Sequence, residues 1–144
     1  MKRVTVNGGT IAAYVWDYAD GMEVIKYFWD VAASLDSAAA QLHEGARFAV
    51  CKPSTLKLIF ENAGLKEVET SALDVIAEFT DFEDYWRPFL GGQGPAPAYA
   101  MSLPEGQRAE LRDKLKSALQ SKNGDGISLR ARAWAVRGST RGDA

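Results

Sequence analysis

The pattern that most constrains the fold is a strict alternation of side chains near the end of the chain. Apolar residues stand at every second position from Ile127 to Ala135. The positions between them hold Ser128, Arg130, Arg132 and Trp134. A repeat of two residues is typical of a β-strand whose two faces meet different surroundings. We therefore expect the chain to contain a sheet with two unlike faces.

Two earlier segments are also predicted to be strands. Thr10–Trp16 follows the turn-forming residues Asn7–Gly9 and is rich in β-branched and aromatic residues. Its odd-numbered and even-numbered positions are both mostly apolar, which favours a strand buried inside a layered sheet. Val68–Phe79 has strand character around Val75 and supplies the third strand. The chain is therefore expected to have about three main strands.

Helical patterns separate these strands. Asp20 with Glu23 three residues later forms a capping-box pattern, so a helix is expected to begin there. Ser102 with Glu105 repeats the pattern and predicts a long helix, which Asn123–Gly126 ends. Shorter helices are expected within Asp36–Ala40, Pro53–Gly64 and Asp81–Leu90, and loops at Gly91–Pro97 and after Gly138. This order predicts one α/β domain over residues 1–138 and a tail over 139–144.

Composition excludes several classes of function. The 144 residues include 17 basic and 19 acidic side chains, without the basic excess of a nucleic-acid-binding protein. A single cysteine, Cys51, excludes an internal disulfide and paired-cysteine zinc sites, and a single histidine, His43, excludes a His-rich metal site. No apolar run approaches the ~20 residues of a membrane span, and no signal peptide is recognisable. We expect a cytoplasmic protein without metal, nucleic-acid or membrane partners.

Four segments occur in the order found in a known enzyme family. They are Val6–Asp17, with a Gly-Gly turn before the strand and Trp-Asp at its end, Phe28–Asp30, Asp81–Pro95 and Ala131–Val136. Together they resemble the C-terminal half of a class I S-adenosylmethionine-dependent methyltransferase of the type 11 group. The resemblance extends from Arg3 to Gly138.

The resemblance implies a particular sheet. In the family, the seventh strand inserts antiparallel between the fifth and the sixth. This chain would then form a partial Rossmann-like methyltransferase fold, with strand order first, last, middle and flanking helices. It would lack the N-terminal cofactor-binding half, in which a Gly-rich turn and an acidic residue hold S-adenosylmethionine. Gly91–Gly94 is glycine-rich, but it follows an aromatic helix rather than a strand.

Two functions follow as expectations. The first is a methyltransferase-like chain, truncated or a fragment, whose intact family fold would use S-adenosylmethionine to methylate a small molecule. Alone, this chain is expected to bind no cofactor and to be inactive. The second is a non-catalytic dimeric module that binds a small ligand or a partner. Both leave Thr10–Trp16 at a sheet edge, and an unpaired apolar edge predicts a homodimer through that strand.

Candidate substrate-binding residues lie in two segments. Trp16, Asp17 and Tyr18 end a strand, and ligands of open α/β sheets bind beyond the carboxyl ends of strands. Asp17 could orient a substrate or accept a proton. The alternative is a tryptophan packed on the next helix and an aspartate that makes a local turn bond. A second group, Tyr85, Trp86 and Phe89, is either a lid over an apolar substrate or simply core.

Other chemistry-bearing residues have alternative interpretations. Arg130 and Arg132 share a strand face with Trp134 and could bind an anion, or they pair with carboxylates. His43 and Cys51 are eight positions apart and have no evident orienting partner, which disfavours a nucleophilic pair. We assign no catalytic residue and no cofactor-binding or metal-binding residue.

Overall fold

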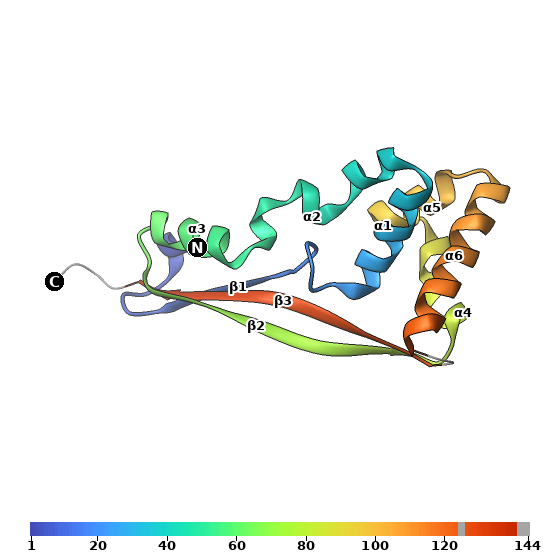
Figure 1. Ribbon diagram of the computed structural model, residues 1–144. Helices are drawn as coiled ribbons and strands as arrows, with labels where there is room; N and C mark the ends of the chain where they lie inside the picture. Colours follow the sequence, from blue (N-terminus) through green and yellow to red (C-terminus); the bar gives the residue numbers. More distant parts are fainter. Residues whose placement is uncertain (124–125, 141–144) are drawn as a thin grey trace.

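The computed structural model describes residues 1–123 and 126–140. Within them, three strands carry a layer of helices (Figure 1). The strands are β1 (Thr10–Trp16), β2 (Lys66–Phe79) and β3 (Ile127–Ser139). The α-helices are α1 (Glu23–Leu35), α2 (Glu44–Arg47), α3 (Pro53–Asn62), α4 (Phe82–Trp86), α5 (Pro95–Ser102) and α6 (Glu105–Asn123). The 3₁₀ helices are η1 (Lys2–Val4), η2 (Ser37–Leu42), η3 (Ala49–Cys51) and η4 (Arg87–Gly91).

The sheet has the order β1-β3-β2, and β3 pairs antiparallel with both neighbours. Ala133 of β3 stands opposite Trp16 on one side and Leu73 on the other. The predicted α/β class and the order first, last, middle are therefore confirmed. Every hydrogen-bonded pair of strands is antiparallel, so the pairing itself does not identify a Rossmann-like sheet. No helix in the described part of the chain is both long and apolar enough to cross a membrane.

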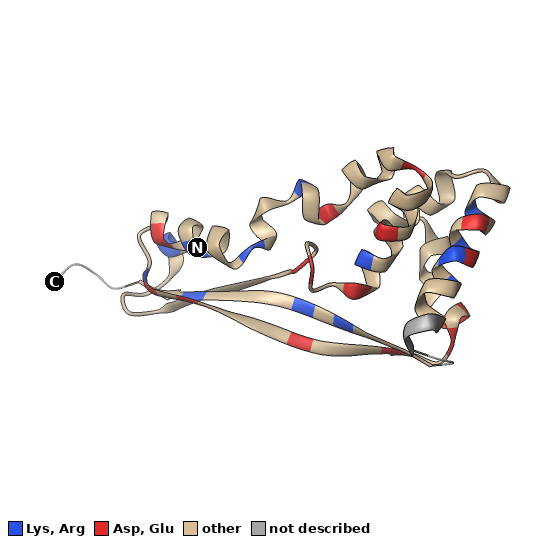
Figure 2. Cartoon of the chain, in the orientation of Figure 1, with Lys and Arg blue, Asp and Glu red and all other residues tan. Residues whose placement is uncertain are grey.

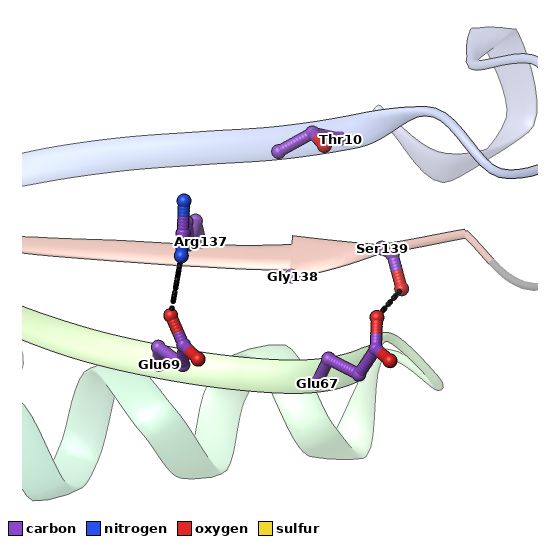
Figure 3. A pocket seen from close by; sticks show the side chains of 6 residues that line it. All are labelled: Thr10, Glu67, Glu69, Arg137, Gly138 and Ser139. Atoms are coloured by element: carbon purple, nitrogen blue, oxygen red, sulfur yellow. Dashed lines mark hydrogen bonds and ion pairs between the residues drawn. The ribbon is translucent and has the colours of Figure 1, made fainter.

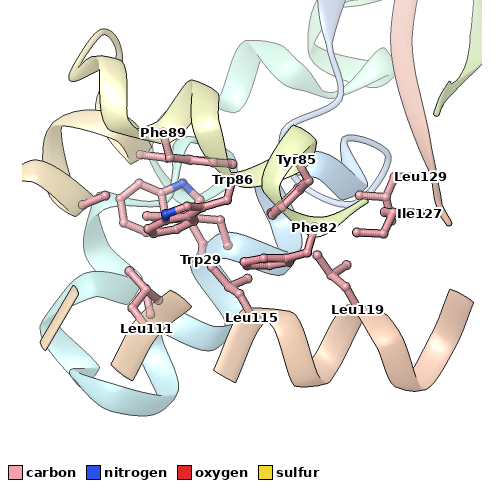
Figure 4. Close-up of a cluster of buried hydrophobic side chains, with 14 of the residues drawn as sticks. Trp29, Phe82, Tyr85, Trp86, Phe89, Leu111, Leu115, Leu119, Ile127 and Leu129 are labelled. Atoms are coloured by element: carbon pink, nitrogen blue, oxygen red, sulfur yellow. The ribbon is translucent and has the colours of Figure 1, made fainter. Parts of the chain in front are cut away.

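The hydrophobic core lies at one end of the sheet (Figure 4). Helix α6 contributes Leu111, Leu115 and Leu119, which are spaced by four residues and fully buried. The aromatic segment that begins at α4 packs between α6 and α1, and the rings of Phe28 and Phe89 stack with centroids 4.7 Å apart. The leucines of α6 and the aromatic residues of α4 and η4 are therefore core residues.

The covered face of β3 changes along the strand. Odd-numbered residues from Ile127 to Ala133 are buried towards α1 and α6, whereas the even-numbered Val136 and Gly138 are buried near α3. Residues of opposite parity lie on opposite faces of a sheet. A Cβ on Gly138 would stand only 3.1 Å from the Cβ of Leu65, so glycine allows the close approach. Figure 1 shows the helices on one side because the sheet twists between its two ends.

The start of α1 differs from the prediction. The helix begins at Glu23 with Met22 as its N-cap residue, and neither Asp20 nor any other side chain caps it. Residues 18–21 form a turn after β1, and Met22 then makes an isolated β-bridge with Ala131 immediately before the helix starts. The Glu23 carboxylate is therefore used elsewhere, and it accepts the backbone N–H of Arg130 at 2.7 Å.

The segment before α6 also differs. Part of the predicted loop Gly91–Pro97 belongs to α5, in which Pro95 occupies the first turn. Ser102 ends α5 instead of capping α6, and its hydroxyl donates to the carbonyl of Tyr99 at 2.7 Å. A proline at the first turn is compatible with a helix because that position needs no N–H. The predicted stop at Asn123–Gly126 falls partly outside the described residues.

Thr140, which follows β3, is hydrogen-bonded to the residues that precede β1. β3 continues to Ser139, and the buried Thr140 donates its hydroxyl to the carbonyl oxygen of Val6 at 2.6 Å. The backbone N–H of Thr140 also donates to the carbonyl of Gly9 at 2.9 Å. Residues 141–144 of the predicted tail lie outside the described residues.

Candidate functional site

A pocket of about 460 Å³ lies beyond the carboxyl end of β1. We call it the Glu44 pocket, after the charged side chain in its wall. Met22, Val24 and Ile25 form one side, and Ala77 and Phe79 of β2 with Ala131 of β3 form another. Tyr18 and the segment from Gln93 to Pro97 complete it. The walls are mostly apolar, with a few polar groups, as in sites for small organic molecules.

Close backbone contacts hold the pocket in shape. After β1, a turn at residues 18–21 stays beside β3, because the Asp17 N–H donates to the carbonyl of Arg132 at 2.8 Å and the Arg132 N–H donates to the carbonyl of Gly21 at 2.9 Å. A Cβ on Gly21 would stand 2.5 Å from the Cβ of Arg132. A Cβ on Gly45 would stand 2.6 Å from the carbonyl oxygen of Tyr18. Both glycines therefore permit approaches that a larger residue would block, and α2 comes to lie against the loop that carries Tyr18.

Glu44 is the unusual residue of this pocket. The residue lines the pocket, although it is only 5% exposed. One carboxylate oxygen, Oε2, accepts the indole N–H of Trp29 at 2.6 Å. Among the described residues, no lysine, arginine or histidine forms an ion pair with it. The pocket lining thus contains a buried acid whose single donor among the described residues is neutral.

The structure separates the three predicted residues at the end of β1. Tyr18 lines the Glu44 pocket, and burial, reinforced by Glu44 and Cys51, raises the pKa of its phenol. Asp17 is buried, and its Oδ1 accepts the N–H of Asp20 at 3.2 Å, which is the local turn bond considered as the alternative. Trp16 is 39% exposed and shares a sheet face with Ala133.

The predicted aromatic group lies behind the pocket wall. Tyr85, Trp86 and Phe89 are buried in the hydrophobic core. The Tyr85 hydroxyl donates to the carbonyl of Val24 at 2.9 Å, and burial raises the pKa of this phenol. Its ring also meets Phe79 edge-on, with centroids 5.4 Å apart. Tyr85 therefore supports two wall residues from behind.

Sequence reasoning missed Glu44, Phe79 and Gln93 as pocket residues. Glu44 begins a helix of only four residues, too short to reveal an apolar face by its periodicity. Phe79 ends a predicted strand without a signal for the face on which it lies. Gln93 lies in a glycine-rich segment that was predicted only as a loop. The contacts that make these residues neighbours are all long-range.

The two strand arginines have different surroundings. Arg132 donates from Nε and Nη2 to the two oxygens of Asp74, at 2.7 and 2.9 Å, and its guanidinium lies 5.4 Å from the Trp134 ring centre. Hydrogen bonds from Arg132 lower the pKa of Asp74, and the same contact raises the pKa of Arg132. This agrees with the carboxylate-pairing interpretation. The Nε of Arg130 is buried and has no partner among the described residues.

His43 and Cys51 show no sign of activation. The Nδ1 of His43 accepts the N–H of Gly45 at 2.9 Å, and burial lowers the pKa of its imidazole. Burial likewise raises the pKa of the Cys51 thiol, the opposite of what a nucleophilic cysteine needs. In residues 1–123 and 126–140, no three metal-ligating side chains form a group that could hold an ion.

A second concavity, of about 260 Å³, lies at the far end of the sheet (Figure 3). We call it the Arg137 hollow. Its charges are paired internally, because Arg137 donates to Glu69 at 2.7 Å and the Ser139 hydroxyl donates to Glu67 at 3.2 Å. These groups already satisfy one another, so the hollow has less to offer a charged ligand than the Glu44 pocket.

Comparison with known proteins assigns no family. Neither a protein-family model nor a curated protein matches this chain.

Proposed function

We propose that this chain is the substrate-side part of a class I methyltransferase-like fold, with a partial Rossmann-like sheet. The observation that carries the proposal is the place of β3, which lies antiparallel between β1 and β2. The family resemblance implies this order, in which the last strand separates two strands that run parallel to each other. The proposed compartment is the cytoplasm, where the thiol of Cys51 stays reduced.

The Glu44 pocket is the proposed site of the methyl acceptor. It lies beyond the carboxyl end of β1, where ligands of open α/β sheets bind. Methyl transfer is an in-line displacement that depends mainly on positioning, and the apolar walls beside Tyr18 would hold a small organic acceptor. Trp16 and Asp17 would belong to its surroundings rather than to its lining. We assign no catalytic residue.

The described residues do not fit S-adenosylmethionine. The family holds this cofactor with a Gly-rich turn between a strand and a helix. Here the glycine-rich segment lies between η4 and α5, and Gly92 and Gly94 have positive φ angles of 67° and 90° that end one helix and begin the other. The proposal is therefore that this chain alone does not bind the cofactor and is inactive.

Calorimetric titration of the chain with S-adenosylmethionine tests this proposal. We expect no saturable heat at tens of micromolar protein, because the geometry for the cofactor is absent from the described part. A dissociation constant below about 1 μM, corresponding to roughly −8 kcal/mol, would overturn the proposal. The same titration after addition of a candidate acceptor shows whether the acceptor creates a cofactor site.

We further propose that the chain forms a homodimer through the outer edge of β1. The bond from Asp17 N–H to Arg132 shows that odd-numbered residues of β1 direct their backbone groups towards β3. Even-numbered residues, from Thr10 to Trp16, therefore direct theirs outward. No described residue bonds to these outward groups. The strand carries no charge along its length (Figure 2), so nothing on it repels a second copy.

A two-fold axis at Ala13 gives the edge a self-complementary register. Every outward residue of one copy then meets an outward residue of the other, as antiparallel pairing requires. Tyr14 would stand opposite Ala12, and Trp16 opposite Thr10, so each large side chain meets a small one. Tyr14 is 69% exposed in the single chain and would gain cover from this arrangement. The result would be a continuous six-stranded sheet.

Proline substitution tests the dimer with a matched control. Ala12→Pro removes an outward N–H of β1 and should convert a dimer to a monomer in light scattering. By the same reasoning Ala72, opposite Trp134, directs its N–H away from β3 at the other sheet edge. Ala72→Pro should therefore leave the dimer intact. A wild-type monomer at tens of micromolar, or equal effects of the two substitutions, would contradict the β1 interface.

A non-catalytic dimeric module is the second candidate function. The observation that favours it is the complete Glu44 pocket within a chain whose glycine-rich segment does not fit the cofactor. Both candidates predict a small ligand in the pocket. They differ in methyl transfer, which the first predicts only when a cofactor-binding part is present and the second never predicts.

A further inference from the structure

We infer that the Glu44 pocket binds a small apolar molecule that carries a protonated amine, with the Glu44 carboxylate as its counter-ion. This inference rests on the proposed small-molecule site, and it names the class of ligand. Three parts of the site's chemistry favour this ligand: an acid without a cationic partner among the described residues, walls that suit a hydrocarbon body, and a local charge that disfavours an anion.

The first part is the incomplete pairing of Glu44. Burying an ionised carboxylate is costly unless donors or an opposite charge compensate for the lost water. Trp29 supplies one neutral donor at 2.6 Å. Lys26 is a neighbouring cation on α1, but its ammonium group is bonded to Asp30 at 3.1 Å. An ammonium group entering the pocket would supply the charge and the donors that the described residues do not provide.

The second part is the nature of the walls. Val24, Ile25 and Pro97 present carbon atoms, and Phe79 adds an aromatic ring. A cation beside an aromatic face gains further attraction. The raised pKa of Tyr18 keeps its phenol neutral, so it can donate or accept without adding negative charge. The volume of about 460 Å³ lies within the usual range for organic ligands.

The third part is the charge around the pocket. Asp17 is buried like Glu44, and both carboxylates raise the pKa of the nearby Cys51 thiol. Two acids therefore act on one buried region. Asp17 also interacts with the guanidinium of Arg132, but no described arginine or lysine lines the pocket. A carboxylate or phosphate ligand would be repelled, and a neutral alcohol would leave the charge of Glu44 uncompensated. An amine is the ligand class that the site complements.

Three probes of one shape test this in the wild-type chain by calorimetry. They are 2-phenylethylamine, 2-phenylethanol and phenylacetate, at a pH where the amine is protonated. A hydrogen bond to a charged group predicts that the amine binds about tenfold or more tightly than the alcohol. Phenylacetate should bind least. Equal affinities of amine and alcohol, tighter binding of phenylacetate, or no binding of the amine would overturn the inference.

A substitution with a matched control sharpens the test. Glu44→Gln removes the charge and keeps an oxygen that can accept the Trp29 N–H, so amine affinity should fall about tenfold while alcohol affinity changes little. Glu78→Gln is the control, because Glu78 lies between the pocket residues Ala77 and Phe79 and points to the opposite sheet face. An unchanged amine affinity in folded Glu44→Gln would contradict the role of the carboxylate.

The outcomes separate this inference from the proposed function. If Glu44→Gln does not fold, the comparison of the three probes on the wild-type chain still decides the ligand class. Failure of the amine to bind would reject the inference and leave the methyltransferase-like proposal standing. Tight binding of S-adenosylmethionine would reject that proposal without bearing on the preference for an amine.

Discussion

The end of the sheet where β3 begins and the middle of the sheet are built on similar strand patterns but have different surroundings. At the end where β3 begins, Ile127 and Leu129 are buried under α1 and α6. In the middle of the sheet, Tyr14, Leu73 and Val75 of the two outer strands are 69%, 50% and 57% exposed. An apolar residue in a strand is therefore buried only where a helix covers it.

The two edges of the sheet differ in the same way. β2 carries Glu67, Glu69, Asp74 and Glu78 along its length, whereas β1 carries no charged residue (Figure 2). Charges on an edge strand discourage pairing with another chain, and their absence invites it. The contrast gives a physical reason for placing the proposed dimer at β1 and not at β2.

The largest expected change in the free energy of unfolding comes from comparing a buried leucine with a half-exposed one. Leu115→Ala removes a fully buried side chain of α6 and should lower the free energy of unfolding by about 3 kcal/mol. Leu73→Ala, at a half-exposed position in the middle of β2, should lower it by about 0.5 kcal/mol or less. Urea unfolding measures both. Similar losses would mean that the sheet face at Leu73 is covered in solution.

The second effect concerns the buried bond between the core and the Glu44 pocket. Trp29→Phe keeps an aromatic ring but deprives Glu44 of its only described donor. It should therefore lower the free energy of unfolding by about 2 kcal/mol. Trp134→Phe is the matched control, because the Trp134 indole nitrogen bonds to no described residue. Urea unfolding of the two variants gives the difference. A cost no greater than that of the control would show that Glu44 finds another donor, such as water.

Sequence reasoning predicted the strands and the core, because these depend on local periodicity. The alternation around Ala131 and the stripe through Leu115 recur at short spacing, so the burial of their apolar faces could be foreseen. After Ala133, the buried residues of β3 change from odd-numbered to even-numbered positions. This change could not be foreseen, because it depends on which helix lies above each part of β3. The strand order followed from the family resemblance, not from any periodicity.

The candidate site was predicted only in part, for a related reason. Tyr18 was expected because the end of a strand is a recognisable position. Glu44 was not expected, because its burial comes from long-range contacts with Trp29 and from the close approach at Gly45. Nothing in the local sequence distinguishes this glutamate from an exposed one.

A smaller change in stability is expected from the ion pair between Arg132 and Asp74 in the middle of the sheet. Hydrogen bonds from Arg132 hold the pKa of Asp74 below its usual range. A carboxylate with a lowered folded-state pKa stabilises the protein above its unfolded-state pKa and loses this contribution as the pH falls through the folded-state value. Asp74→Asn should therefore be less stable than wild type at pH 6, and the difference should narrow below about pH 4. A difference that widens in acid would contradict the assigned direction.

The smallest effect is expected at the Arg137 hollow, and it sharpens the contrast with Glu44. Arg137 and Glu69 pair at 2.7 Å, but their side chains are 69% and 64% exposed. Water replaces a lost partner at such a site, so Arg137→Gln should change the free energy of unfolding by about 0.5 kcal/mol or less. The change should shrink further in 1 M salt, which screens exposed charges. A loss as large as that of Trp29→Phe in the same urea titration would mean that the hollow is closed to solvent, for instance by a second copy of the chain. The energetic distinction between the two sites depends on this difference in access to water.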